Sequence, residues 1–507
     1  MNNRFFKNII FLLFVNLLIK PFWILGIDRS VQNIVGDTSY GIFLAISNFS
    51  YLFYIILDMG LTNFNNRNIA QNHQLLSKHF IGISQAKLFL SLIYFIVIFS
   101  IGWLIGYNGE QMKLLAIVGF NQMLLSFILY LRSNISALLL FKTDSILSVL
   151  DRMLMIFICG FLLWSGLFPR YNFNIYWYVY SQTVSYLITM AIALFIVLRH
   201  TKKLIFRFNL PFIIVIIRKS LPYALLILLM SFYFRLEPVL IERILPPDIA
   251  SFQVGIFARA YRLFDAGNNI TNLFNVILLP LFATMIKQEE DVQSLVKQSL
   301  GLIISMTVLI SVLCIFYSKD IMHLLYGMQE YETTEIFNKR IEESSHIFQI
   351  LMTSFVFISI SYIFNTLLTA NGSLRILNIV AASAVLVNIV LNFIFIPNFK
   401  AIGAAYTSLC VHSTACVLQY FIARNKFSLR IKVFFWLKVL IYIICIVTTT
   451  LFTTKLNLTW YYSFTIALII GIGWAIITKL LDIKDLKDLL FSTLAKRQNE
   501  TKKQQKY

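Results

Sequence analysis

The side chains with the clearest chemical meaning are charged residues inside long apolar segments. Arg235 and Glu237 fall in one such segment, and Arg259, Arg262 and Asp265 fall in the next. An ionised group at the centre of a bilayer costs about 2.5–3.5 kcal/mol on insertion scales, so it needs a partner, an aqueous cavity or a route to the interface. Guanidinium groups bind phosphate oxygens through paired N–H donors. These positions therefore predict a site for an anionic group, and a pyrophosphate fits their excess of positive charge.

A polar stripe follows the segment that begins near Arg259. At about 100° per residue, Arg259, Arg262, Asp265, Asn269 and Asn272 fall within a helical face of roughly 140°. The alternative is that the arginines extend to the outer interface and Asp265 pairs with one of them. Because Arg262 and Asp265 lie deeper in the segment, we expect this face to line a binding cavity.

Two prolines stand beside charged residues in matching places. Lys20-Pro21 lies in the first apolar segment and Glu237-Pro238 in the seventh, and each proline removes a backbone hydrogen bond. We expect Pro21 and Pro238 to act as hinges and Lys20 to contribute to the anion site. The alternatives are that Lys20 reaches the outer interface and that Arg235 and Glu237 pair with other helices, since they lie about 200° apart around their own.

No constellation for catalysis or for a resident metal is visible in the sequence. The six histidines are scattered, the five cysteines all fall in apolar segments, and no nucleophile elbow or phosphate-cradling loop occurs. We expect a protein that is not an enzyme and has no cofactor. A coupling ion, proton or sodium, is left open, with Asp265 or Glu237 as its carrier.

The elements that position these residues are membrane spans. The chain is 59% hydrophobic and 13% charged, with a mean hydropathy of +0.77, which excludes a soluble domain. Segments of about 20 apolar residues predict about fourteen transmembrane helices. They lie near 8–27, 39–60, 80–106, 112–131, 146–168, 174–198, 220–243, 252–285, 293–318, 345–370, 374–396, 402–423, 432–454 and 459–480. We expect the first to be an uncleaved signal anchor and residues 319–344 to form the longest external segment.

The net charge of +20 follows the membrane topology rather than a nucleic-acid surface. If the amino terminus and every second loop are cytoplasmic, those loops hold about three times as many Lys and Arg as the others. Both termini are then expected in the cytoplasm of a bacterial inner membrane, with anionic lipid as a partner and no nucleic acid. A further group of charges is assigned to inner helix ends or inner loops: Asp58, Arg67, Arg132, Lys142, Asp144, Asp151 and Arg152.

An internal echo organises the chain. Tyr40-Gly41-Ile42-Phe43 returns roughly 215 residues later as Val254-Gly255-Ile256-Phe257, as expected of a duplicated transporter. We expect an all-α integral membrane protein with an N-lobe over 1–198, a basic cytoplasmic linker over 199–219 and a C-lobe over 220–423. Two further spans cover 424–480, and residues 481–507 form a cytoplasmic amphipathic helix and polar tail.

Two stretches carry a resemblance to a known family. The first is Gly26 to Gly36 (GIDRSVQNIVG), followed by Tyr40-Gly41 and by Leu57 to Arg67 (LDMGLTNFNNR). The second is Asn388 and Asn392, four residues apart, followed by Ile396-Pro397 and Gly403-Ala404-Ala405. In these motifs and in its hydropathy pattern the chain resembles the multidrug, oligosaccharidyl-lipid and polysaccharide exporter superfamily. Within it, the chain is similar to the Wzx-type flippases of oligosaccharide repeat units.

This resemblance implies two six-helix lobes, a parallel pseudo-repeat, around a central cavity that opens alternately to the two sides. It implies a pyrophosphate site at Lys20, Arg29, Arg235, Arg259 and Arg262. From their places in the membrane segments, we expect Glu237, Asp265 and Asn269 to contact the substrate as well. The drug-exporting branch commonly carries an acidic residue in its first lobe for cation coupling. Here the first span offers Lys20 instead, which favours an anionic cargo.

The resulting prediction is a flippase for an undecaprenyl-pyrophosphate-linked oligosaccharide in O-antigen, capsule or exopolysaccharide synthesis. Such a protein works beside a polysaccharide polymerase and glycosyltransferases. Three alternatives remain: a cation-coupled multidrug exporter, a lipid II flippase, and a membrane polymerase or glycosyltransferase. An enzyme of the last kind would need a large external loop or a carboxylate pair, and the sequence offers neither.

Overall fold

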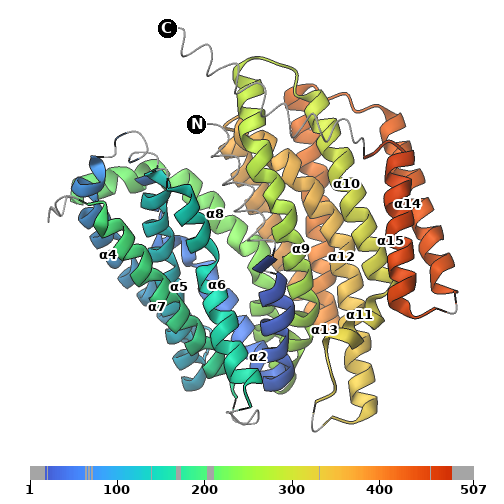
Figure 1. Ribbon diagram of the computed structural model, residues 1–507, viewed down its shortest axis with the longest axis horizontal. Helices are drawn as coiled ribbons and strands as arrows, with labels where there is room; N and C mark the ends of the chain where they lie inside the picture. Colours follow the sequence, from blue (N-terminus) through green and yellow to red (C-terminus); the bar gives the residue numbers. More distant parts are fainter. Residues whose placement is uncertain are drawn as a thin grey trace. The chain divides into compact units, whose positions relative to one another are not determined.

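The computed structural model describes a chain built of helices (Figure 1). It describes residues 18–19, 21–62, 65–66, 69, 72, 74–138, 140–166, 173–201, 210–329, 332–456 and 458–481, and these contain no β-strand. Most of the first predicted span, Lys20, the linker core 202–209 and the tail 482–507 lie outside these residues. For the part that is described, the prediction of an all-α membrane fold is confirmed.

The helices follow the predicted spans closely. In chain order they are η1 (Trp23–Asp28), α2 (Arg29–Leu52), η2 (Tyr54–Leu57), α4 (Leu75–Leu104), α5 (Gly109–Ala137), α6 (Phe141–Trp164), α7 (Ile175–Arg199), α8 (Leu210–Ile244), α9 (Pro247–Lys287), α10 (Gln293–Phe316), α11 (Ser318–Leu325), α12 (Thr334–Ala370), α13 (Leu374–Phe427), α14 (Val433–Thr454) and α15 (Trp460–Ile477). Of these, η1 is a π-helix and η2 a 3₁₀-helix.

Ten of these helices are long and apolar enough to cross a membrane. Their outer faces carry large hydrophobic side chains: on α4, Leu88, Phe89, Leu92 and Ile96 are 55–59% exposed. Water would disfavour such a surface, whereas lipid accommodates it. The chain is therefore a multi-pass membrane protein.

Two helices bend where the sequence predicts separate spans. Within α2, Gly36 has φ 80° and turns the chain, while residues 29–35 before it continue the first span as helix. Within α13, Lys400 has φ 54° and ψ −134° and separates two predicted spans. A side chain at Gly403 would lie 2.3 Å from the carbonyl oxygen of Phe395, so the predicted Gly-Ala-Ala motif permits a tight return of the backbone.

The expected external segment 319–344 is more ordered than hydropathy suggests. It contains α11 and the first turns of α12. Thr333 caps α12 because its side chain accepts a hydrogen bond from the backbone N–H of Ile336. A polar cap and charged first turns extend the helix beyond its apolar part.

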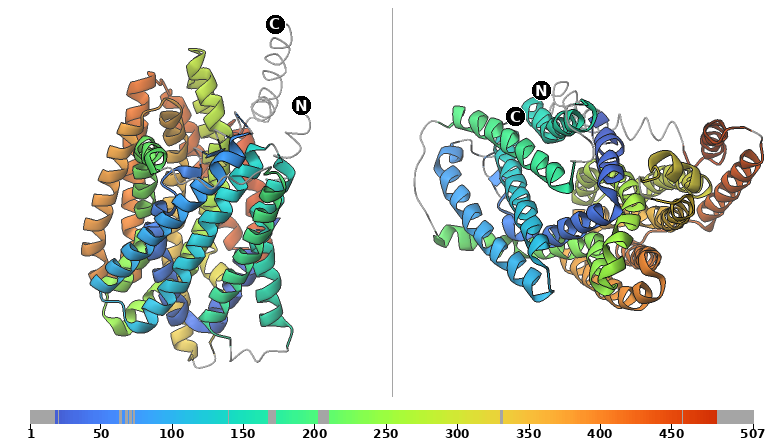
Figure 2. Two further views of the ribbon diagram at one scale, coloured as in Figure 1. Left: turned by 90° about the vertical axis from the view of Figure 1, so that its left-hand side faces the viewer. Right: turned by 90° about the horizontal axis from the view of Figure 1, so that it is seen from below.

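The chain divides into two compact units. Unit 1 comprises Met1–Ala258 with Gln329–Tyr331, and unit 2 comprises Arg259–Met328 with Glu332–Tyr507. In unit 1, α5 and α7 run side by side (Figure 2). In unit 2, α14 and α15 pair and pack on α10, where a side chain at Gly301 would lie 2.6 Å from the carbonyl oxygen of Leu480.

The two echoed glycines meet inside unit 1. A Cβ atom on Gly41 would lie 1.9 Å from the carbonyl oxygen of Ser251, and one on Gly255 would lie 2.2 Å from that of Asp37. The contact is reciprocal, because each glycine packs on the residue four positions before the other. The Gln32 side chain reinforces it by donating hydrogen bonds to Asp37 Oδ1 (3.0 Å) and to the Gly255 carbonyl oxygen (2.9 Å). The backbones of α2 and α9 therefore touch at this crossing.

We expect Gly41→Ala to destabilise the protein by about 3 kcal/mol or more, because a backbone atom of α9 occupies the space of the new methyl group. The measurement is thermal unfolding of the detergent-purified protein. Gly473→Ala in α15 is the control, since nothing lies within 4 Å of its Cβ position and alanine favours helix. A Gly41→Ala protein as stable as the Gly473→Ala protein would contradict the crossing.

Candidate functional site

A buried carboxylate lies where η1 runs into α2. Asp28 is 1% exposed and accepts hydrogen bonds from the hydroxyls of Tyr40 (2.8 Å) and Tyr178 (2.6 Å). The six-residue π-helix Trp23–Asp28 directly precedes α2 and begins two residues after Pro21. Such π-segments are frequent at functional sites in helices. The acidic group of the first span is therefore held inside unit 1 by two phenol hydroxyls, one from α2 and one from α7.

Arg152 lies near the middle of α6. Its guanidinium carbon is 4.3 Å from the centroid of the Trp23 ring, and its Nε is 3.7 Å from a carboxylate oxygen of Asp151. The prediction that Asp151 and Arg152 mark an inner helix end is wrong, because α6 begins at Phe141 and both residues are well inside it. Arg132 and Asp144 do lie near helix ends and pair at 2.8 Å.

Arg29 and Trp23 hold donors without acceptors. Among the described residues, neither the buried Nε of Arg29 nor the buried indole Nε1 of Trp23 has a hydrogen-bond partner. Buried polar atoms of proteins are usually paired, so both donors are available to an acceptor that the described residues do not supply. The role of Arg29 in an anion site stays a prediction.

Arg235 and Glu237 lie on α8 in unit 1. The Arg235 guanidinium is 5.1 Å from the centroid of the Tyr51 ring, and Glu237 is 2% exposed. Pro238 lies within the same helix, which continues past it to Ile244. The hinge roles of Pro21 and Pro238 stay predictions.

The remaining predicted residues lie on α9 in unit 2. Arg259 is fully buried and its guanidinium is 4.6 Å from the Tyr326 ring, while the Tyr326 hydroxyl donates to the Arg259 carbonyl oxygen at 3.2 Å. Arg262 and Asp265 are half-buried, and the exposed Asn269 donates to the Asp265 carbonyl oxygen at 2.8 Å. The stripe therefore runs from a buried arginine to an exposed amide.

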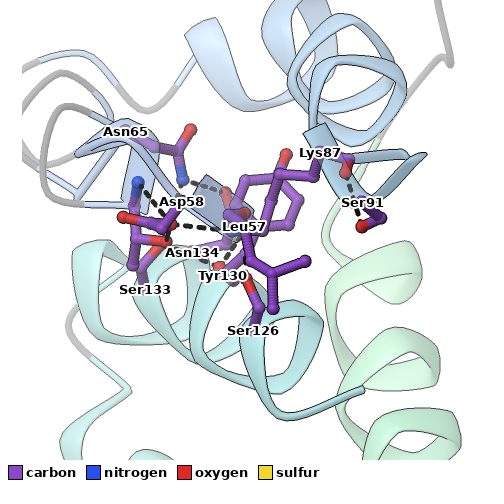
Figure 3. A network of polar contacts seen from close by, with 10 residues as sticks. Leu57, Asp58, Asn65, Lys87, Ser91, Ser126, Tyr130, Ser133 and Asn134 are labelled. Carbon is purple, nitrogen blue, oxygen red and sulfur yellow. Dashed lines mark hydrogen bonds and ion pairs between the residues drawn. The ribbon is translucent and has the colours of Figure 1, made fainter. Parts of the chain in front are cut away.

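A network of polar contacts joins η2 to α4 and α5 (Figure 3). The Lys87 ammonium is 2.7 Å from Asp58 Oδ1 and donates to the Leu57 carbonyl oxygen at 3.1 Å, and Lys87 is 1% exposed. Ser126 donates to the same carbonyl oxygen at 3.1 Å. Nearby, Asn65 donates to Ser133 and Asn134. The motif that begins at Leu57 and Asp58 thus lies at the end of a span, and its hydrogen bonds connect that end to α4 and α5.

Two buried acids with neighbouring arginines occupy matching positions of the repeats, which the sequence reasoning missed. Asp28-Arg29 and Glu242-Arg243 are separated by 214 positions, as are Gly41 and Gly255. Glu242 is 7% exposed and accepts from Gln111 Nε2 at 2.7 Å, while Arg243 lies over the Tyr107 ring at 4.5 Å. Aligning the chain on its glycine echo would have revealed both pairs.

Comparison with known proteins agrees with this architecture. The model of the family described as "Polysaccharide biosynthesis protein" matches residues 5–286, which is more than half of the chain. The chain belongs to the polysaccharide biosynthesis protein family. A second model, that of the lipid II flippase MurJ, matches residues 268–471. No curated protein matches the chain.

Solved structures share the fold of this family member. The lipid II flippase MurJ in an inward closed conformation is 16% identical with a TM-score of 0.67, over 93% of this chain and 97% of that one. An inward-facing multidrug resistance MATE transporter of the MOP superfamily is 13% identical with a TM-score of 0.62, over 80% and 93%. A MOP superfamily transporter from Pyrococcus furiosus is 12% identical with a TM-score of 0.54, over 82% and 92%. At these identities the likeness shows a transporter fold.

We expect Lys87→Met to destabilise the protein by about 3–5 kcal/mol, because it leaves Asp58 without its cation in a nearly buried place. Thermal unfolding of Lys87→Met, Asp58→Asn and the double variant forms a mutant cycle. The double variant should lose less than the sum of the single variants. Lys113→Ala is the control, since the Lys113–Glu110 pair is 69% and 70% exposed and its removal should have no measurable effect. Additive losses would contradict the coupling.

Proposed function

We propose that this protein is a flippase that moves an undecaprenyl-pyrophosphate-linked oligosaccharide repeat unit across the bacterial inner membrane. Its product would feed O-antigen, capsule or exopolysaccharide synthesis. The observation that carries the proposal is the set of buried donors in the first span, Trp23 Nε1 and Arg29 Nε, which have no acceptor among the described residues, together with the Arg152 guanidinium over the Trp23 ring.

The chemistry of these groups suits a pyrophosphate. A guanidinium that stacks on an aromatic ring is held by its face, while its N–H groups point outward from its edge. Phosphate oxygens accept such edge donors in pairs. Arg152 and Arg235 are both held this way in unit 1, and Arg259 is held this way in unit 2.

Membership of the polysaccharide biosynthesis family supports the same cargo class. The guanidinium groups of Arg29, Arg152 and Arg235 can donate hydrogen bonds to an anionic head group. Glycosyltransferases would supply such a substrate and a polymerase would consume it. We propose that the protein itself makes no covalent bond and that it alternates between two open states, with Pro21 and Pro238 as hinges and with Glu237 or Asp265 as carriers of a coupling ion.

A lipid II flippase is the second candidate, because the MurJ model matches residues 268–471. Lipid II is also a polyprenyl-pyrophosphate-linked saccharide, so the anion chemistry does not separate the two. Growth of a deletion strain separates the two candidates. Loss of a sole lipid II flippase stops cell-wall synthesis, whereas loss of a repeat-unit flippase removes a surface polymer.

We expect deletion of the gene to leave cells viable, with polyprenyl-linked repeat units accumulated and surface polymer lost. Complementation with Arg152→Glu, Arg262→Glu or Lys20→Glu should restore less than about a tenth of the polymer, since one charge-assisted bond contributes about 1.5–3 kcal/mol. Mass spectrometry of extracted lipid-linked saccharides and quantification of surface glycan check both.

The control is Lys113→Glu, which reverses the charge of an exposed residue at the start of α5 and should complement fully. Membrane abundance of each variant is measured by immunoblot. Normal polymer from the Arg152→Glu and Arg262→Glu proteins would remove these residues from the substrate path. Unchanged glycans in the deletion strain would contradict the flippase itself.

A further inference from the structure

Two tyrosine rings are stacked where α2 gives way to η2. The centroids of Tyr51 and Tyr54 are 5.3 Å apart and their planes differ by 8°. The stack spans the junction of two helices, because Tyr51 lies in the last turn of α2 and Tyr54 begins the 3₁₀-helix η2. Both residues are half-buried.

A cation completes this group. The Arg235 guanidinium of α8 lies 5.1 Å from the Tyr51 centroid. One turn earlier on α8, Phe232 meets Phe53 edge-on at 6.1 Å and 89°. That contact holds α8 against the end of α2, so it fixes Arg235 beside the tyrosines. All of these residues belong to unit 1.

We propose that Tyr51, Tyr54 and Arg235 form a saccharide subsite, in which sugar rings next to the pyrophosphate pack on the tyrosines while Arg235 binds a phosphate oxygen. The inference rests on the proposed function and extends it to the glycan. A pyranose has a face of C–H groups and a rim of hydroxyls. Tyrosine matches it with an apolar ring and a polar tip, and binding sites commonly combine such surfaces with a few placed polar groups.

Another stacked pair in unit 1 lacks the cation and serves as a control. Phe95 and Phe99 of α4 are 5.9 Å apart with planes 19° from parallel. They are also half-buried, and no cation of a described residue is recorded over either ring. If the tyrosine stack serves only packing, replacing one of its rings by alanine should affect lipid binding in the same way as the corresponding change at Phe95 or Phe99.

The experiment measures binding of two lipids to the full-length protein in nanodiscs. One is undecaprenyl pyrophosphate carrying the repeat unit, extracted from the deletion strain, and the other is undecaprenyl pyrophosphate alone. Tyr51→Ala and Tyr54→Ala should each weaken binding of the glycan-bearing lipid about three- to tenfold and leave binding of the bare lipid unchanged. Tyr51→Phe and Phe95→Ala should leave both unchanged, and Arg235→Gln should weaken both lipids.

Equal losses for the two lipids in Tyr51→Ala, or the same result as for Phe95→Ala, would overturn the subsite while leaving the flippase intact. A wild-type protein that binds neither lipid would overturn both proposals. If Tyr51→Ala does not fold, Tyr51→Leu retains bulk without an aromatic face and is expected to show the same glycan-specific loss. Full binding of both lipids by Tyr51→Leu and Tyr54→Ala would likewise reject the subsite.

Discussion

The backbone contact between Gly41 and Gly255 is the constraint on which unit 1 depends. At each glycine, a carbonyl oxygen of the other helix occupies the space that a side chain would need. The close approach of α2 and α9 therefore depends on the absence of two Cβ atoms. Residues on either side of the crossing then take their places. Tyr40 reaches Asp28, and further along α2 Tyr51 lies under Arg235. The candidate site in this unit is thus positioned by a backbone contact that involves no functional side chain.

Lipid imposes a second condition, since a polar group within it must find partners inside the protein. Among the described residues, this chain meets the condition with aromatic rings and carbonyl oxygens as well as with carboxylates. Arg152, Arg235 and Arg259 lie over ring faces, and Lys87 combines one carboxylate with one backbone carbonyl. A ring stabilises a cation without neutralising its charge.

The spans were predictable because length and hydropathy are local properties of the sequence. Most helices begin and end near the predicted bounds, whereas α8 and α12 begin earlier, at Leu210 and Thr334. The turn at Lys400 was not visible as a left-handed residue, since a lysine with positive φ leaves no sequence signal. The depth of Arg152 was misjudged because α6 begins earlier than its apolar run, at Phe141.

The predicted site residues themselves show how far a sequence reaches. Intramembrane charge identified Arg235, Arg259 and Arg262, yet the rings that hold two of them come from distant segments, Tyr51 and Tyr326. Such pairings are three-dimensional and have no spacing rule. Asp28 escaped notice for the same reason, as its partners lie 12 and 150 residues away. Only the repeat could have pointed to it, through Glu242.

The reciprocity of the glycine crossing also has the form of a contact between equivalent residues. Two copies of one half, related by a twofold axis, would make this contact through one residue that meets its own equivalent. In a single chain that residue stands twice, as Gly41 and Gly255. Their surroundings differ, since Asp37 accepts a hydrogen bond from Gln32 whereas Ser251 occupies the matching position. A single chain can therefore keep a symmetric backbone contact while the side chains around its two sides differ, which a symmetric homodimer cannot do.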